Sequence, residues 1–160
     1  MTSMHHDHAT ARPEGAALTR LAMSATLHCL TGCAIGEVLG LVLATWWGWA
    51  DAPSILLAVG LAFLFGYALT IMPVLRSGLP LRTAVGVALA ADTVSILTME
   101  IVDNAIMLAV PGAMEAGLLD PLFWGALAVA LAVAFVVTVP VNRALIGRGK
   151  GHAVVHQYHH

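Results

Sequence analysis

The sequence predicts an all-α integral membrane protein, built as a bundle of four transmembrane helices. Of its 160 residues, 59% are hydrophobic and only 10% are charged, and the mean hydropathy of +0.88 lies far above that of an ordinary globular domain. Four long apolar stretches reach or exceed the ~20 residues that span a bilayer. Every Lys and Arg lies near an end of such a stretch or in a terminal tail.

The four apolar stretches differ in composition. The first is too long for a signal-peptide core and lacks a small-residue cleavage site, so we expect it to remain as a membrane helix. The second and fourth contain almost only small and aliphatic residues with Phe, which suits helices that face lipid or support their neighbours. The first and third also contain polar residues. The expected segments are a His-bearing tail at 1–17, a transmembrane domain at 18–146 with spans near 21–49, 53–72, 81–110 and 121–139, and a Gly/His-rich tail at 147–160.

The basic residues predict the orientation of the bundle. They lie before the first stretch, between the second and third, and after the fourth, whereas the other two connections contain only acidic charges. By the positive-inside rule, both termini and the middle connection are expected in the cytoplasm. The tryptophans then fall at the outer interface, where amphipathic rings settle. The basic residues are Arg12, Arg20, Arg76, Arg82, Arg143, Arg148 and Lys150, and the tryptophans are Trp46, Trp47, Trp49 and Trp124.

A weak duplication divides the chain into two helical hairpins. Acidic, proline and arginine positions of the segment 51–76 recur in kind in the segment 120–143. Because each half contains two spans, such repeats would be parallel, related by an axis along the membrane normal. Chance similarity between two apolar stretches is the alternative interpretation.

Reactive side chains follow one face of the first span. Cys29, Cys33 and Glu37 recur at i, i+4 spacing and therefore share that face. A doubled small-xxx-small pattern lies beside it and allows a neighbouring backbone to approach closely. Plain packing is one interpretation of this pattern, but we also expect the face to join copies of the chain in a homo-oligomer. The pattern consists of Gly32, Gly36 and Gly40.

An acidic face is predicted along the third span. At 100° per residue, a sector of this helix contains three carboxylic acids together with a hydroxyl and a thioether. A charged carboxylate at mid-bilayer costs at least ~2.5 kcal/mol, and no basic residue is placed to neutralise the set. Protonation, water or a bound cation must therefore compensate these groups. The sector contains Asp92, Ser95, Met99, Glu100 and Asp103.

The two polar faces are expected to form a ladder of metal ligands, because equal steps from the membrane boundary place them at matching depths. Cys29 would lie level with Asp92, and Glu37 with Glu100. Thiols, thioethers and imidazoles favour Cu(I) or Zn(II), so we expect a transition-metal ion, copper first and zinc second, and no organic cofactor. The predicted ligands are His28, Cys29, Cys33, Glu37, Asp92, Met99, Glu100 and Asp103, with Ser95 and Asn104 as a secondary polar path.

Histidines in the tails could capture or release this metal. His152 and His156 are one helical turn apart and precede His159 and His160, which suits chelation if that tail becomes helical. An unselected flexible tail is the alternative for the N-terminal histidines.

These features favour a lipid-embedded protein that binds and translocates a cation, rather than an enzyme. The sequence contains no nucleotide-binding loop, no favourable Ser-His-Asp arrangement and no basic surface for nucleic acid. Two alternatives stay open. One is a proton or alkali-cation channel that uses the carboxyl groups alone, and the other is a structural or assembly factor of a membrane complex.

Three segments resemble an uncharacterised bacterial membrane family, known only as domain of unknown function 4396. They are HCLTGCAIGEVLG at 28–40, ADTVSILTMEIVDN at 91–104 and PVNRALIGRGKGHAVVH at 140–156. The resemblance extends over nearly the whole chain, from about residue 27 to residue 156. It implies a multi-pass protein of the bacterial inner membrane and supplies no activity.

Overall fold

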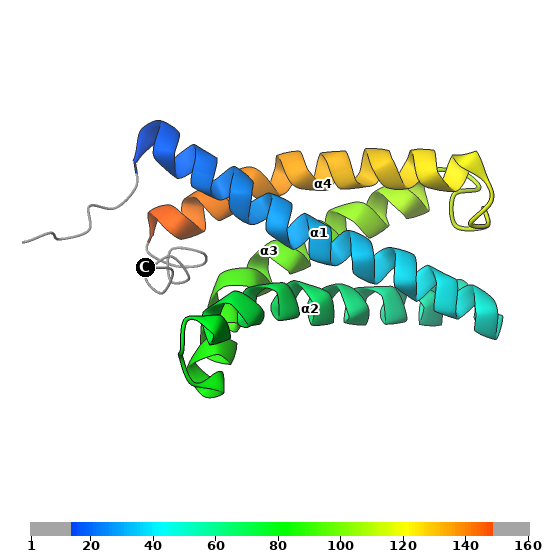
Figure 1. Cartoon of the computed structure of the whole chain (residues 1–160). Helices are drawn as coiled ribbons and strands as arrows, with labels where there is room; N and C mark the ends of the chain where they lie inside the picture. The colour runs from blue at the N-terminus through cyan, green and yellow to red at the C-terminus, as the bar shows by residue number, and fades with distance from the viewer. Residues whose placement is uncertain (1–13, 149–160) are drawn as a thin grey trace, which may run out of the picture.

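Residues 14–148 fold into a bundle of four antiparallel helices in the computed structural model, which describes this range (Figure 1). The helices are α1 (Gly15–Trp47), α2 (Asp51–Arg76), α3 (Leu81–Ala109) and α4 (Pro121–Gly147). Each is long and apolar enough to cross a membrane. The described part of the chain therefore confirms the predicted all-α, four-span class.

Three of the helices extend beyond the apolar stretches that predicted them. α1 begins six residues before the expected 21–49 span and ends at Trp47. The next residue, Gly48, caps the helix with a φ of 65°, a left-handed conformation that suits glycine. α2 and α4 continue through Pro73 and Pro140 for a further turn or more. A proline removes only one backbone donor, and neighbouring helices stabilise such a turn in a membrane bundle. Hydropathy therefore marked the lipid-crossing part of each helix, not its full length.

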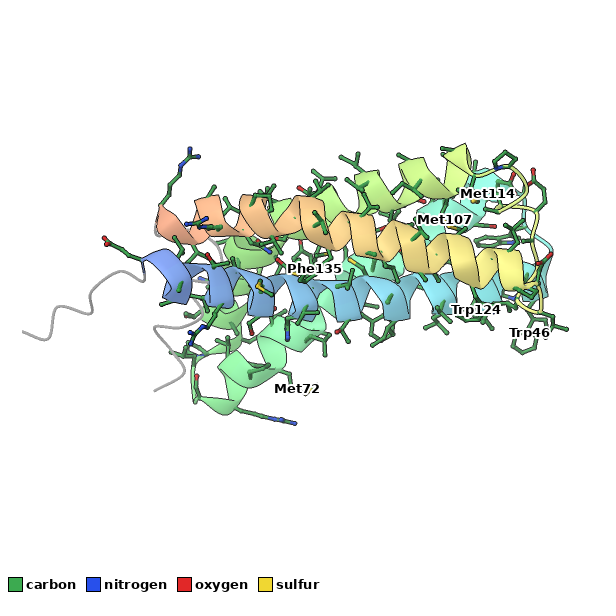
Figure 2. The ribbon with its side chains drawn as sticks, turned by 90° about the horizontal axis from the view of Figure 1, so that it is seen from above. Trp46, Met72, Met107, Met114, Trp124 and Phe135 are labelled. Carbon is green, nitrogen blue, oxygen red and sulfur yellow. The ribbon has the colours of Figure 1, made fainter. Side chains whose placement is uncertain are left out.

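The helices are arranged so that α1 and α3 lie between α2 and α4 (Figure 1). α1 packs most extensively along α2, and it also contacts α4 and α3. Figure 2 shows Trp46 and Trp124 at the same end of the bundle. We call this end the tryptophan end. We call the opposite end the arginine end, because it contains Arg20, Arg76, Arg82, Arg143 and Arg148.

Glycines allow α1 and α2 to pack with their backbones in contact. A Cβ atom on Gly32 would lie 2.7 Å from the Gly66 Cα, and one on Gly40 would lie 2.6 Å from the Ala58 Cα. A Cβ on Gly36 would overlap the backbone of Ala62. The small-residue face of α1 is thus covered by α2 of the same chain. This face is therefore not free to join two copies of the chain as predicted, because α2 already occupies it. A homo-oligomer stays a prediction and would need another surface.

Candidate functional site

The acidic residues of α1 and α3 point into the bundle rather than toward lipid. Relative exposure is 8% for Glu37, 0% for Asp92, 4% for Glu100 and 3% for Asp103. The arginines of residues 14–148, in contrast, are all exposed. Four buried acids therefore share the interior with no buried arginine in the described part of the chain.

These acids and the two cysteines come together as pairs across the α1–α3 interface. Cys29 Sγ donates a hydrogen bond to Asp92 Oδ1 at 3.6 Å. One turn further along α1, Cys33 lies beside Glu100. The next turn places Glu37 beside Asp103, with Glu100 as its second acidic neighbour. The interface is thus a continuous series of acidic and thiol groups.

The pairing differs in part from the depths counted along the sequence. Cys29 lies beside Asp92 as expected. Glu37, expected level with Glu100, has Asp103 as a neighbour as well as Glu100, and Cys33 also lies beside Glu100. Counting residues assumes two parallel helices in a fixed register, whereas the packing of the whole bundle sets the actual register.

Three sulfur-containing side chains lie in one buried cluster between α1 and α3. Cys29, Cys33 and Met99 are each 1% exposed and pack in a common core with Ala62 and Ile96. We call these three residues the sulfur cluster. Asp92 and Glu100 lie beside it through their contacts with the two thiols. Within residues 14–148, however, no three His, Cys, Asp or Glu side chains converge on a single metal position.

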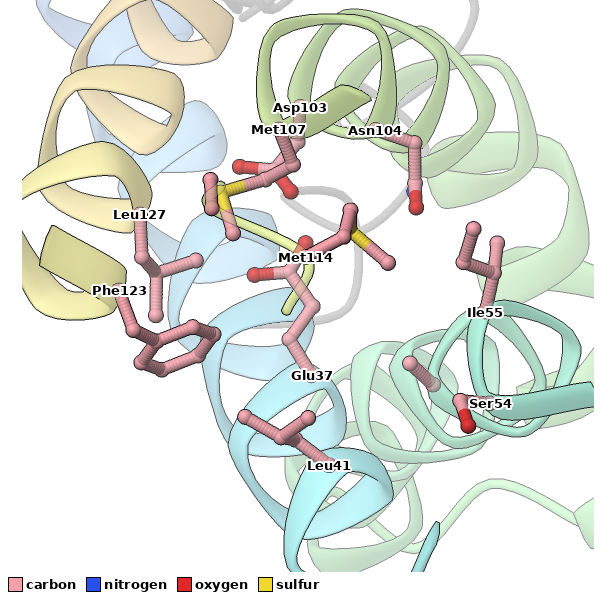
Figure 3. A pocket seen from close by; sticks show the side chains of 12 residues that line it. Glu37, Leu41, Ser54, Ile55, Asp103, Asn104, Met107, Met114, Phe123 and Leu127 are labelled. Atoms are coloured by element: carbon pink, nitrogen blue, oxygen red, sulfur yellow. The ribbon is translucent and has the colours of Figure 1, made fainter. Parts of the chain in front are cut away.

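A cavity of about 60 Å³ opens beside Glu37 and Asp103 toward the tryptophan end. Figure 3 shows that the carboxyl groups of both acids point into it, together with the side chains of Met107 and Met114. All four helices contribute to its wall, and Asn104 also lines it. We call this space the tryptophan-end cavity. Its volume is several times the ~10–15 Å³ that one water molecule needs.

A hydroxyl–amide cluster lies nearer the arginine end and joins three helices. The Asn142 amide of α4 donates a hydrogen bond to Thr26 Oγ1 of α1 at 2.9 Å. The Ser95 hydroxyl of α3 donates to Asn142 Oδ1, and the Thr26 hydroxyl donates to the Ala22 carbonyl at 2.7 Å. All three polar residues are at most 1% exposed. We call Thr26, Ser95 and Asn142 the hydroxyl–amide cluster.

Sequence reasoning missed several of these residues, although the signals were present. Thr26 continues the Cys29–Glu37 face by one turn toward the arginine end, and Met107 continues the face of Asp103 by one turn toward the tryptophan end. Asn142 is the single amide in α4, whose other polar residues are Thr138 and Arg143. Thr70, which is buried beside Asp92, was likewise overlooked because it lies in α2, a mostly apolar helix. The loop residue Met114 gave no periodic signal.

The remaining predicted residues occupy less central positions. His28 is half-buried on α1 and lies about 100° around the helix from Cys29. The Asn104 amide donates to the Glu100 backbone carbonyl at 2.9 Å and to Glu100 Oε2 at 3.5 Å. The proposed chelating histidines of the C-terminal tail lie outside the described residues. They are His152, His156, His159 and His160.

Comparison with known proteins gives a family and no activity. The profile of the family described as "Domain of unknown function (DUF4396)" matches residues 19–151. This range contains α2, α3 and α4 in full and all of α1 except its first four residues. No curated protein and no solved structure matches the chain. The resemblance noted for the three sequence segments is thereby confirmed for the family.

Proposed function

We propose that this chain, which belongs to the DUF4396 family, binds a transition-metal cation inside the membrane and passes it along the interface between α1 and α3. One observation carries the proposal. The sulfur cluster lies between two buried carboxyl groups in an interior that contains no arginine within residues 14–148. A bound cation would supply the missing positive charge. Its function on this proposal is binding and passage, with no chemical conversion.

The ligand types favour a soft metal ion. Two thiols and a thioether suit Cu(I), with Zn(II) as the second choice, whereas carboxyl groups alone would suit harder ions. The Asp92 and Glu100 carboxyl groups can accept the protons that the cysteines release, or offset the charge of the ion. Copper is therefore the first metal to test.

The route would follow the length of the interface. Cys33 interacts with Glu100, Glu37 and Cys29, and Glu37 in turn interacts with Asp103. These contacts connect the sulfur cluster to the tryptophan-end cavity. The positive-inside rule assigns the arginine end to the cytoplasm, where the histidines of the two tails would exchange the metal with soluble carriers.

Metal analysis of the purified full chain tests the proposal. The protein in mild detergent is loaded with Cu(I) under reducing conditions, and separately with Zn(II), and bound metal is measured after desalting. We expect bound copper in the wild type and its loss in the Cys29→Ser/Cys33→Ser double variant. Thr31→Ala is the matched control, because Thr31 is exposed on the same helix. Failure of the wild type to retain copper or zinc would refute the proposal.

A proton or alkali-cation channel is the second candidate, and one observation favours it. Within residues 14–148 the acids and thiols form pairs rather than a group of three or more ligands, and pairs of buried carboxyl groups are typical of proton pathways. Flux into proteoliposomes separates the candidates. A channel would retain proton or potassium flux in the double cysteine variant and lose it in Glu37→Gln/Asp103→Asn. A metal carrier would lose copper uptake in both variants.

A further inference from the structure

We infer that the tryptophan-end cavity is a second cation site, which captures a soft monovalent cation with the carboxyl groups of Glu37 and Asp103 and the thioethers of Met107 and Met114. The inference rests on the proposed function, because it gives the metal a first binding position outside the sulfur cluster. It adds ligands that the two polar faces do not contain. One of them, Met114, lies in the connection between α3 and α4.

The two acids of this cavity are buried and incompletely paired. Glu37 is 8% exposed and Asp103 is 3% exposed. Neither Glu37 oxygen, nor Asp103 Oδ1, has a hydrogen-bond partner among residues 14–148. Both side chains line the cavity and point into it (Figure 3). Buried polar groups in proteins are nearly always hydrogen-bonded, so oxygens left in this state point to a ligand.

The cavity is also placed and shaped for a cation. Its lining contains two acids and no basic residue, and the Asn104 side chain adds an amide. Glu37 lies nine residues before Trp46 on α1, so the acids are roughly 14 Å below the tryptophan end of that helix. Because both acids are buried, a cation beside their carboxyl groups would be attracted more strongly than one at an exposed carboxyl group in water.

The two methionines specify the kind of cation. Met107 is 6% exposed and Met114 is half-buried, and both side chains enter the cavity from different elements (Figure 3). Thioethers bind Cu(I) and other soft ions and do not attract Mg²⁺ or Ca²⁺. Thioether ligands need no deprotonation, in contrast to thiols. The cavity would therefore take up a soft monovalent ion, which then passes to the thiols of the sulfur cluster.

The connection between α3 and α4 holds Met114 in place. The Ala116 amide donates to the Gly112 carbonyl at 2.9 Å, and the Trp124 indole donates to the Leu118 carbonyl at 2.8 Å. These bonds order the segment on both sides of Met114. The α3–α4 connection is thereby a part of the proposed site and not only a link between helices.

A silver titration of the full-length protein in detergent tests this inference. Ag(I) is a soft monovalent ion that does not change oxidation state under these conditions, and free histidine in the buffer competes with the histidine tails. Calorimetry gives the number and affinity of sites. We expect two sites in the wild type. Met107→Leu/Met114→Leu, a volume-conserving change, should weaken one site by about tenfold or more and leave the other unchanged.

Two further variants complete the design. Met23→Leu/Met72→Leu is the matched control, because those methionines are 43% and 51% exposed and lie outside the cavity. Cys29→Ser/Cys33→Ser should abolish the other site and leave the cavity site intact.

The outcomes separate the inference from the proposed function. Unchanged titration of Met107→Leu/Met114→Leu, with loss of a site in the cysteine variant, would overturn the cavity site and leave the proposed function standing. Loss of a site in the methionine variant, with unchanged titration of the cysteine variant, would support the cavity site and overturn the sulfur cluster. A wild type that binds no silver would overturn both.

Discussion

Two polar clusters of the bundle, the hydroxyl–amide cluster and the pair of Glu37 and Asp103, are buried in opposite ways. Toward the arginine end, the amide and hydroxyls of the hydroxyl–amide cluster bond to one another across three helices. Toward the tryptophan end, Glu37 and Asp103 face a cavity of about 60 Å³ with oxygens that have no partner in the described chain. In lipid, a buried polar group without a partner is costly. The hydroxyl–amide cluster therefore contributes to stability, whereas burial of the Glu37 and Asp103 oxygens costs stability.

A buried polar residue in a membrane bundle therefore does not have a single meaning. Asn142 and Glu37 are both buried polar residues in membrane helices. Only the contacts around each one distinguish a structural role from a binding role. Substitutions in the two halves should therefore change stability and binding in opposite directions.

The largest loss of stability should come from a change in the backbone contact between α1 and α2. Gly36→Val places a side chain where the backbone of Ala62 lies, so α1 and α2 must separate. We expect a loss of about 3 kcal/mol of stability, measured by reversible unfolding in mixed detergent micelles. Gly60→Val is the control, because a Cβ on Gly60 has no atom within 4 Å. Equal losses in the two variants would contradict the assigned α1–α2 contact.

Asn142→Leu should lower stability by about 1–3 kcal/mol. The change removes the bonds to Thr26 and Ser95. Thr26 keeps its bond to the Ala22 carbonyl, but the buried Ser95 hydroxyl loses its acceptor. Asn104→Leu, in the other half, should cost less, since the Asn104 amide bonds only to Glu100 of its own helix in the contacts observed here. The same unfolding assay measures both. The contrast between the halves fails if Asn104→Leu is the more damaging change.

Glu37→Gln should raise the stability of the metal-free protein, whereas the two substitutions above lower it. It removes an acid that has no basic partner in its surroundings, so we expect stability to rise by about 1 kcal/mol. Metal should reverse the order, because a ligand at 100 times its Kd stabilises the protein that binds it by about 2.7 kcal/mol. Thermal unfolding without and with Cu(I) measures the stability of the metal-free protein and its stabilisation by the metal. A variant that is less stable without metal and equally stabilised by it would assign Glu37 a structural role.

The smallest effect should be local to the α3–α4 connection. Trp124→Phe removes the bond to the Leu118 carbonyl and should cost about 0.5 kcal/mol. Hydrogen exchange should become faster in residues 110–120 and stay unchanged around Asn142. Trp46→Phe is the control, since Trp46 is 80% exposed at the same end. Faster exchange throughout the bundle would show that the two halves are not independent.

The sequence alone predicted those features of this protein that depend on a single helix and its surroundings. Hydropathy predicted the four membrane helices, because each must cover its own backbone polar groups and present about 20 apolar residues to lipid. The 3.6-residue period predicted that Cys29, Cys33 and Glu37 share a face, and that Asp92, Glu100 and Asp103 share another. The scarcity of basic residues predicted that no Lys or Arg neutralises the buried acids, and every arginine of residues 14–148 is exposed. Each of these properties depends on one helix and its solvent.

Which side chains meet depends on how the four helices pack against one another. The pairing of Glu37 with Asp103, the bonds of Asn142 to two other helices, and the approach of Met114 to the cavity all depend on how four helices cross and pack. The glycine face of α1 is a further example. Its small-residue pattern predicted that some helix could approach closely, but only the packing of the bundle identifies that helix as α2. Periodicity fixes the direction in which a side chain points from its helix. The partner that it reaches is set by packing between segments that are distant in the sequence.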